Sequence, residues 1–293
     1  MAYGNHSQLQ GNHMKKILII LRAYSWPASA VPVILGSVTA YNAGAFSPAD
    51  FVLTLLAALA VHSGANLANT YFDFKNGVDK PDFSDDRALV DGLIAPAAAL
   101  RLTVALFAAG AAIGLYLSVK HRLPLLLGLG AAGFLLAWFY TADGVSYKYK
   151  ALGELGIFLA FGPFIVTGTA LIQTGRILTD ALWVSAPVGL LITAIVHANN
   201  MRDINSDPGS GVKTLAGLLG PERSRTFYRA LLFTPYAFAL SQGLWPAVFI
   251  VVSLPFALKL NALSAGGDFS PLVRETAKFV AVFGLLFAAG LWV

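Results

Sequence analysis

Two polar clusters interrupt a chain that otherwise avoids charge, and each lies where a long apolar run ends. They occupy residues 69–79 and 199–207, and their carboxylates are Asp73, Asp79, Asp203 and Asp207. Acidic side chains are costly to hold near lipid, so carboxylates in these places are candidates for function. Spaced carboxylate and amide oxygens are also what Mg²⁺ takes as ligands beside a phosphate. The pattern therefore predicts a metal-dependent site for a phosphorylated compound.

Helical spacing relates the residues within each cluster. Asn69 and Asp73 are four apart and share a helix face, and Asn66 lies one turn earlier on it. A second stripe, of Asn199, Asp203 and Asp207, forms if that helix continues to Pro208. Two such stripes facing across a cavity would hold two Mg²⁺ ions. The alternative is helix capping or structural hydrogen bonding, which suits one isolated aspartate better than two matched clusters.

The composition indicates that this chain lies in a membrane. The 293 residues are 57% hydrophobic and 12% charged, with a mean hydropathy of +0.68; a soluble domain is usually about 25% charged. Apolar stretches of about 20 residues indicate membrane helices rather than a barrel. The absence of cysteine excludes disulfides and thiolate chemistry. The net charge of +5 follows from Lys and Arg at the span ends, so we expect the lipid bilayer and not nucleic acid as a partner.

Hydropathy predicts an all-α polytopic membrane protein with nine transmembrane helices. The expected spans are 17–41, 49–74, 95–119, 122–140, 151–173, 180–200, 226–243, 244–263 and 271–292. Asn69 and Asp73 lie 130 residues before Asn199 and Asp203, which suggests two pseudo-repeated four-helix halves around a central cavity. Residues 1–13 are expected to be an expression-tag remnant ahead of a single transmembrane domain, 14–293.

Charge asymmetry orients the predicted spans. With the N-terminus in the cytoplasm, every Lys and Arg except Lys120, Arg122 and Arg176 falls on or beside the cytoplasmic side. Both acidic clusters then face the cytoplasm, as do the long loops near 75–94 and 201–225. We therefore expect the active surface on that side, in a bacterial cytoplasmic membrane.

Cations near the clusters are candidate diphosphate ligands. Arg202 lies inside the second cluster, and Lys148 follows the fourth span; Lys75 and Lys213 are further candidates. For such residues the alternative is an ordinary anchor at the membrane surface. His62 and His197 lie within spans, where a histidine is more often a packing residue than part of an acceptor pocket.

At these residues the chain resembles the UbiA superfamily of membrane prenyltransferases. The matching motifs are Asn69-x-x-x-Asp73-x-x-x-x-x-Asp79 after the second span and Asp203-x-x-x-Asp207 after the sixth. Within the superfamily it resembles the menaquinone and vitamin K2 branch, which includes 1,4-dihydroxy-2-naphthoate prenyltransferases. The segments that carry this finer resemblance are 69–79, 84–91, 199–207 and 211–215.

The resemblance implies Mg²⁺-dependent transfer of a polyprenyl group from polyprenyl diphosphate to an aromatic acceptor, without an obligate protein partner. The implied metal ligands are Asn69, Asp73, Asp79, Asp203 and Asp207. The implied catalytic residues are Asp73, Asp203, Lys148 and Arg202. The implied substrate-binding residues are His62, Asn66, Asn69, Lys75, Tyr140, Lys148, Asn200, Arg202 and Lys213. In the naphthoate reaction the ring also loses CO₂.

Other functions predict different sequence patterns. The nearest alternative is the same transfer to 4-hydroxybenzoate or homogentisate. A cation-coupled secondary transporter would place its charges near the bilayer midplane, whereas both clusters here are expected at one face. A CDP-alcohol phosphotransferase would need a compact Asp-x-x-Asp-Gly-x-x-Ala-Arg motif, which this sequence lacks.

Overall fold

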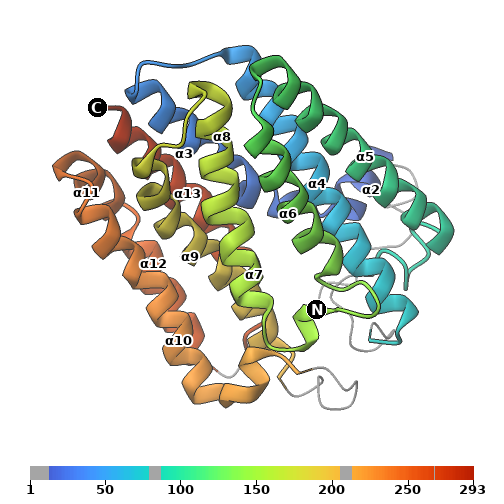
Figure 1. Cartoon of the computed structure of the whole chain (residues 1–293). Helices are drawn as coiled ribbons and strands as arrows, with labels where there is room; N and C mark the ends of the chain where they lie inside the picture. The colour runs from blue at the N-terminus through green and yellow to red at the C-terminus, as the bar shows by residue number, and fades with distance from the viewer. Residues whose placement is uncertain (1–12, 79–86, 205–212, 267) are drawn as a thin grey trace.

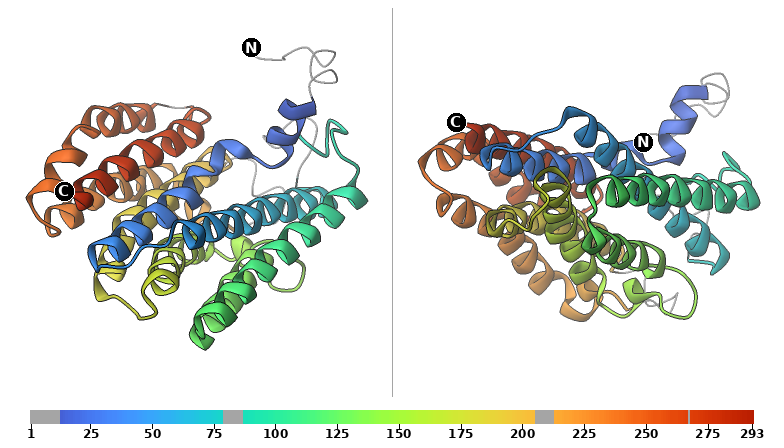
Figure 2. Two further views of the ribbon diagram at one scale, coloured as in Figure 1. Left: turned by 90° about the horizontal axis from the view of Figure 1, so that it is seen from above. Right: turned by 45° about the horizontal axis from the view of Figure 1, so that its top comes forward.

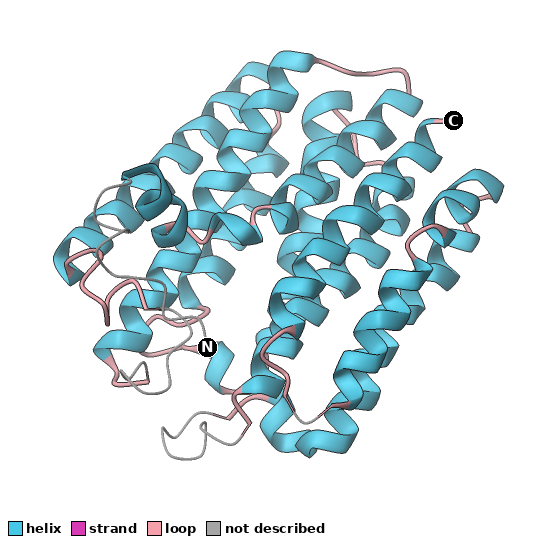
Figure 3. Cartoon of the chain, turned by 180° about the vertical axis from the view of Figure 1, so that it is seen from behind, coloured by secondary structure: helices cyan, strands magenta, loops and turns pink. Residues whose placement is uncertain are grey.

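The chain folds into a bundle of helices, as the hydropathy predicts (Figure 1). The computed structural model describes residues 13–78, 87–204, 213–266 and 268–293. Figure 3 shows helices joined by loops, and no strand, in this part of the chain. Within these ranges, one isolated β-bridge joins Lys150 to Lys213. The all-α prediction is therefore confirmed.

In the first half of the described chain, the four longest helices begin at proline. Its elements are α2 (His13–Ile20), η1 (Ala23–Ser25), α3 (Pro27–Asn42), α4 (Pro48–Lys75), α5 (Pro96–His121) and α6 (Pro124–Phe139). Proline is favoured in the first turn because it has no N–H to leave unsatisfied there. The side chain of Ser47 also caps α4 by accepting a hydrogen bond from the Asp50 amide.

The second half contains more breaks. Its elements are η2 (Tyr147–Tyr149), α7 (Gly153–Leu159), η3 (Ala160–Phe164), α8 (Ile165–Thr174), α9 (Thr179–Arg202), α10 (Leu215–Leu240), α11 (Leu244–Val251), α12 (Leu254–Ala265) and α13 (Leu272–Trp292). The π-helical turn η3 contains Pro163, which removes one helical hydrogen bond. Gly220 (φ 73°) kinks α10 in the same half.

The count of nine spans is not confirmed, although helix occurs in each predicted range. In the described ranges, four helical stretches are long and apolar enough to cross a membrane: Pro48–Lys75, Pro96–His121, Gly153–Thr174 and Thr179–Arg202. The number rises to six if α2 with α3 (bent by 57°) and α11 with α12 (bent by 54°) each form one span. The remainder are α6, which has 16 residues, and α10 and α13, which carry charged residues in their N-terminal halves. The protein is thus a multi-pass membrane protein, and its exact number of crossings stays a prediction.

The main hydrophobic core lies on one side of the bundle. It joins α3 with α9, α10 and α13, and its largest buried side chains include Tyr228, Phe279, Phe283 and Phe287. In both views of Figure 2, α5 and α6 lie on the opposite side of the bundle from α10–α12. Smaller hydrophobic clusters serve that side. A cavity lies between the two regions, and α3 contacts both. The pseudo-repeat of two four-helix halves stays a prediction.

Candidate active site

The two motif-bearing helices, α4 and α9, end at the same end of the bundle (Figure 1). Asn69 on the last turns of α4 and Asn199 on the last turns of α9 line the same cavity. At the other end of α4, Asp50 pairs with Lys120 (2.6 Å), one of the three cations predicted for the outer side. The acidic clusters therefore share one end of the molecule, as the charge pattern predicts.

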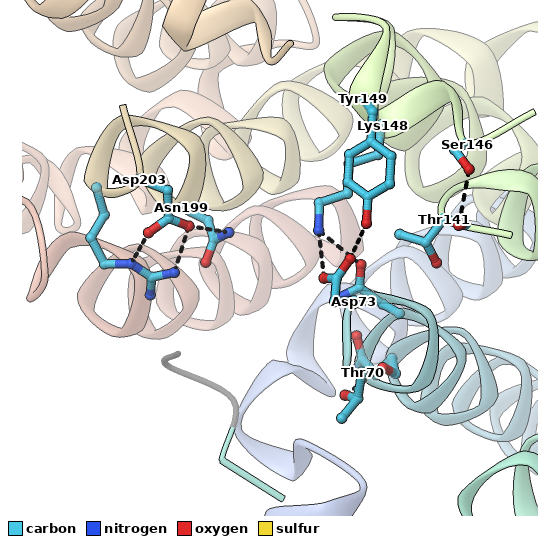
Figure 4. A network of polar contacts seen from close by, with 11 residues as sticks. Thr70, Asp73, Thr141, Ser146, Lys148, Tyr149, Asn199 and Asp203 are labelled. Atoms are coloured by element: carbon cyan, nitrogen blue, oxygen red, sulfur yellow. Dashed lines mark hydrogen bonds and ion pairs between the residues drawn. The ribbon is translucent and has the colours of Figure 1, made fainter. Parts of the chain in front are cut away.

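In the first cluster, Asp73 is held by residues from another element. Its side chain is buried, and the Lys148 ammonium lies 2.9 Å from Asp73 Oδ2 and 3.0 Å from Asn69 Oδ1. The Tyr149 hydroxyl donates to Asp73 Oδ1. Both carboxylate oxygens are thus engaged by the turn η2 (Figure 4). The Lys148 ammonium also lies over the rings of Tyr140 (5.9 Å) and Tyr149 (5.4 Å), at cation–π distance.

In the second cluster, Asp203 is held by its own helix. The Arg202 guanidinium grips it from the adjacent position, with Nε 2.7 Å from Oδ1 and Nη2 2.8 Å from Oδ2. The Asn199 amide lies 3.5 Å from Oδ2. Figure 4 shows Asn199 and Asp203 on one side and Asp73 with Lys148 and Tyr149 on the other. The side chain of Asp203 is 28% exposed, against 7% for Asp73, so the second carboxylate is the more open.

The turn that presents Lys148 and Tyr149 is fixed by several contacts. Tyr147 packs so closely on α7 that a Cβ at Gly156 would overlap its ring. Its hydroxyl donates to the Leu136 carbonyl (2.8 Å), and burial raises the pKa of Tyr147, which keeps this donor protonated. The Lys148 amide bonds the Tyr140 carbonyl (3.0 Å). These contacts aim the Lys148 ammonium at α4.

A cavity of about 510 Å³ extends from the polar clusters into the bundle. Asn69, Lys148, Tyr140 and Asn199 line its polar end, while apolar residues of α5, α6 and α8 form much of its wall. Gly114, Gly130, Gly133 and Gly168 lie on that wall where an added Cβ would meet nothing. Its size and largely apolar lining suit a ligand with a charged head and a hydrocarbon body.

A separate polar network lies along the cavity wall. His62 Nδ1 lies 2.8 Å from Ser29 Oγ, and Nε2 lies 3.3 Å from Ser25 Oγ. Asn66 donates to Ser25 Oγ (3.0 Å), which in turn donates to the Arg22 carbonyl (2.8 Å). Since Ser25 gives its only proton to that carbonyl, His62 Nε2 is the donor toward Ser25 and Nδ1 accepts from Ser29. All four side chains line the cavity.

Four predicted substrate-binding residues do not line this cavity: Lys75, Asn200, Arg202 and Lys213. Lys75 is half-exposed and pairs with Asp143 (2.6 Å); hydrogen bonds from Lys75 and Asn76 hold the pKa of Asp143 below its usual range. Asn200 is buried and donates to Glu154 (3.1 Å). Lys213 meets the turn η2 through its backbone. Asp79 and Asp207 lie outside the described residues.

Some residues at the site were not predicted. Tyr149 was assigned no role from the sequence, although it bonds Asp73 directly. Ser25 and Ser29 lie in a small-residue stretch whose proximity to His62 is purely tertiary. The alternation of Tyr147, Lys148 and Tyr149 before the fifth span was the one sequence signal for Tyr149. No sequence pattern indicated the two serines.

The donor set at the polar end fits a hard divalent cation. Asn69, Asp73, Asn199 and Asp203 offer only amide and carboxylate groups, which is the oxygen chemistry that Mg²⁺ prefers. Within the described ranges, however, no three acidic or histidine side chains converge closely enough to form a metal centre on their own. An ion would therefore need oxygens from elsewhere, as Mg²⁺ usually takes them from water and substrate phosphates.

Comparison with known proteins agrees with these features. Residues 29–279 match the model of the UbiA prenyltransferase family, which covers most of the chain. The chain belongs to this family. It is 37% identical over 284 residues to human UbiA prenyltransferase domain-containing protein 1, a match that covers 94% of this chain and 82% of that protein. The chicken protein of the same name is 36% identical over 285 residues, covering 94% and 84%.

Solved structures show the same fold. A UbiA homolog from Aeropyrum pernix K1 superposes with a TM-score of 0.67 at 21% identity, over 91% of this chain and 95% of that one. A UbiA homolog from Archaeoglobus fulgidus, bound to GPP and Mg²⁺, gives 0.65 at 18% identity, over 93% and 99%. The protein is a UbiA-type prenyltransferase. The named relatives are animal proteins, so they give the expected bacterial membrane no support.

Proposed function

We propose that this protein transfers a polyprenyl group from polyprenyl diphosphate to an electron-rich aromatic ring, with the diphosphate bound between the two carboxylate clusters. One observation carries the proposal: Asn69, Lys148 and Asn199 line one end of a cavity whose remaining walls are mostly apolar. The polar end suits the charged head of such a donor, and the apolar walls suit its hydrocarbon tail. Both clusters lie at this end, an arrangement that does not favour a transporter.

The carboxylates and amides are proposed to hold Mg²⁺. Asn69, Asp73 and Asp203 would be ligands, and the sequence pattern adds Asp79 and Asp207. When bound, Mg²⁺ neutralises the diphosphate and stabilises the charge that develops as it leaves. The relative from Archaeoglobus fulgidus, which was solved with GPP and Mg²⁺, supports this assignment by its fold.

Lys148 and Arg202 are proposed to donate hydrogen bonds to the diphosphate. Each is already fixed by a carboxylate, Lys148 by Asp73 and Arg202 by Asp203. Donors fixed before the reaction stabilise developing charge without reorganising, which is the main source of electrostatic catalysis. The C–O bond then breaks heterolytically: the electron pair leaves with the diphosphate, and an allylic cation remains in the cavity.

The cavity walls are proposed to protect that cation from water. Tyr140, Phe134 and Phe161 are among the lining residues. Aromatic faces attract a cation, and apolar walls keep out the water that would quench it. The aromatic acceptor attacks the cation through a ring carbon, and the ring then loses a proton, or CO₂ where a carboxylate occupies that carbon.

The polar network of Ser25, Ser29, His62 and Asn66 is the proposed contact for the acceptor's oxygen substituents. It lines the same cavity as the diphosphate site. The sequence resemblance favours 1,4-dihydroxy-2-naphthoate, and the alternatives are 4-hydroxybenzoate and homogentisate. We propose that the site faces the cytoplasm, because Lys and Arg concentrate at this end.

The test uses purified protein in detergent with Mg²⁺, labelled polyprenyl diphosphate and each acceptor in turn. We expect a prenylated product that disappears when Mg²⁺ is chelated and in both Asp73→Ala and Asp203→Ala. A naphthalene-1,4-diol without the carboxylate separates ring recognition from CO₂ release. Failure of transfer to every acceptor, with the donor still bound, would overturn the proposal.

A further inference from the structure

Residues 147–154, which we call the coupling segment, contact both carboxylate clusters. At its start, Lys148 and Tyr149 hold Asp73 of α4. At its end, Glu154 contacts α9 in the turn that carries the second cluster. One short stretch of chain therefore touches the supports of both sides of the cavity.

Glu154 is the centre of a buried polar contact between α7, α9 and α10. A single carboxylate oxygen, Oε1, lies 2.9 Å from His197 Nδ1 and 3.1 Å from Asn200 Nδ2. His197 Nε2 lies 3.2 Å from the Ser224 carbonyl, which can only accept, so Nε2 carries a proton. One further proton lies between Glu154 and His197, and the pair is neutral overall wherever that proton resides. All three side chains are buried.

This contact fixes the helix end that presents the second cluster. Asn200 directly follows Asn199, which lines the cavity, and Asp203 lies one turn beyond. On the far side of residues 205–212, Lys213 pairs with the coupling segment through its backbone. Its carbonyl accepts from the Ala151 amide (2.8 Å), and its amide donates to the Tyr149 carbonyl (3.3 Å). The coupling segment therefore contacts the chain on both sides of that stretch.

Two features suggest that this arrangement does more than stabilise the fold. Ser146 (φ 42°) and Ala151 (φ 57°) adopt left-handed conformations that non-glycine residues rarely take, and they bracket the turn carrying Lys148. Such conformations persist where surrounding contacts impose them, typically at functional sites. In addition, Glu154 Oε2 is buried without a hydrogen-bond partner in the described part of the chain, a cost that stability alone does not explain.

We propose that the coupling segment sets the position of the second cluster relative to the first, and that Glu154 is the positioning residue, acting through His197 and Asn200. The inference rests on the proposed diphosphate site between the clusters. Glu154 does not line the cavity and is not a catalytic residue. Its effect is to hold Asn199 and Asp203 where a diphosphate bound by Asn69 and Lys148 can reach them.

The test compares Glu154→Gln with a matched control. Glutamine keeps the volume but places either N or O where one oxygen now serves both His197 and Asn200, so one contact must fail. Tyr228→Phe is the control, because it removes a buried bond of 2.6 Å to Thr276 elsewhere in the core. The measurements are equilibrium binding of polyprenyl diphosphate with Mg²⁺, the KM of donor and acceptor, and the melting temperature.

We expect Glu154→Gln to weaken donor binding by roughly tenfold, as losses of supporting contacts around metal sites do, with the acceptor KM unchanged. Tyr228→Phe should leave donor binding unchanged at an equal or larger loss of melting temperature. Asn200→Ala should weaken donor binding too. The double variant Glu154→Gln with Asn200→Ala should lose less binding free energy than the sum of the two single losses. Unchanged donor binding in Glu154→Gln, or binding losses in both proteins that follow melting temperature, would overturn the proposal. Because binding is measured directly, a wild type that binds donor but transfers nothing would contradict the proposed function and not this inference.

Discussion

The two carboxylates at the cavity mouth are held in different ways. Asp73 is buried and bound by Lys148 and Tyr149, which come from a turn 75 residues away in the chain. Asp203 is more open and bound by its neighbour Arg202 and by Asn199, all within one helix end. The first cluster depends on contacts with a distant turn, whereas these described contacts of the second come from its own helix, which must itself be positioned.

This difference assigns separate tasks to the two sides. A buried carboxylate with both oxygens engaged is fixed before any substrate arrives, which suits preorganised binding. The more exposed carboxylate of Asp203 has more room to adjust as the diphosphate and its ions enter. Equivalent substitutions in the two clusters should therefore have different effects on stability and activity.

The largest contrast is expected between Asp73→Ala and Asp203→Ala. Both remove a proposed Mg²⁺ ligand, so each should lower kcat/KM by at least about 10³-fold. Asp73→Ala leaves the largely buried cation Lys148 without its carboxylate, which typically costs about 3–5 kcal/mol. Asp203→Ala removes the more exposed carboxylate, 28% against 7%, so its loss of stability should be smaller. Thermal unfolding in detergent measures the difference, and equal stability losses would contradict the comparison.

The next contrast is between two lysines beside the first cluster. Lys148→Met removes the donor shared by Asp73 and Asn69, and we expect kcat/KM to fall about 10²-fold. Lys75→Met removes only an exposed pair with Asp143 and should change kcat/KM by no more than about twofold. Steady-state kinetics on the two proteins provide the check, and similar losses would show that the charge of this face, rather than one contact, binds the donor.

A smaller effect is expected for Tyr149→Phe, which keeps the ring beneath Lys148 and removes the hydroxyl bonded to Asp73. The proposed Mg²⁺ ligand Asp73 remains but loses one contact that orients it. The Mg²⁺ concentration for half-maximal activity should therefore rise by about tenfold or less. Titration of activity with Mg²⁺ measures this. Arg202→Lys provides the comparison on the second side; if it shifts the Mg²⁺ requirement more than Tyr149→Phe does, the first side is not the more preorganised one.

The sequence predicts the locally encoded part of this site. Helical spacing places Asn69 with Asp73 and Asn199 with Asp203, and charge asymmetry places both clusters at one end of the bundle. Contacts between distant segments leave no such pattern: the pairing of Asp73 with Tyr149, or of Glu154 with Asn200, joins residues 46 to 76 positions apart. Asn200, which was predicted to bind substrate, is one of these cases, because it contacts the distant Glu154 instead of the cavity. It is adjacent to Asn199, but a helix turns neighbouring side chains by about 100°, so Asn200 faces the core.

The smallest effect concerns the strained turn on the first side. Ala151→Gly relieves a left-handed alanine, a gain of about 1 kcal/mol, but adds a similar entropic cost in the unfolded chain, so stability should hardly change. Ala151→Val places a β-branched side chain in the same conformation and should be destabilising, because the branch makes left-handed backbone far less accessible. If contacts with Lys213 impose the conformation, the valine protein should also bind polyprenyl diphosphate more weakly than the glycine protein, since Lys148 and Tyr149 lie on the same turn. Equal donor binding by the two proteins would show that the turn can relax without moving Lys148, and that the first cluster is less dependent on it than the contacts suggest.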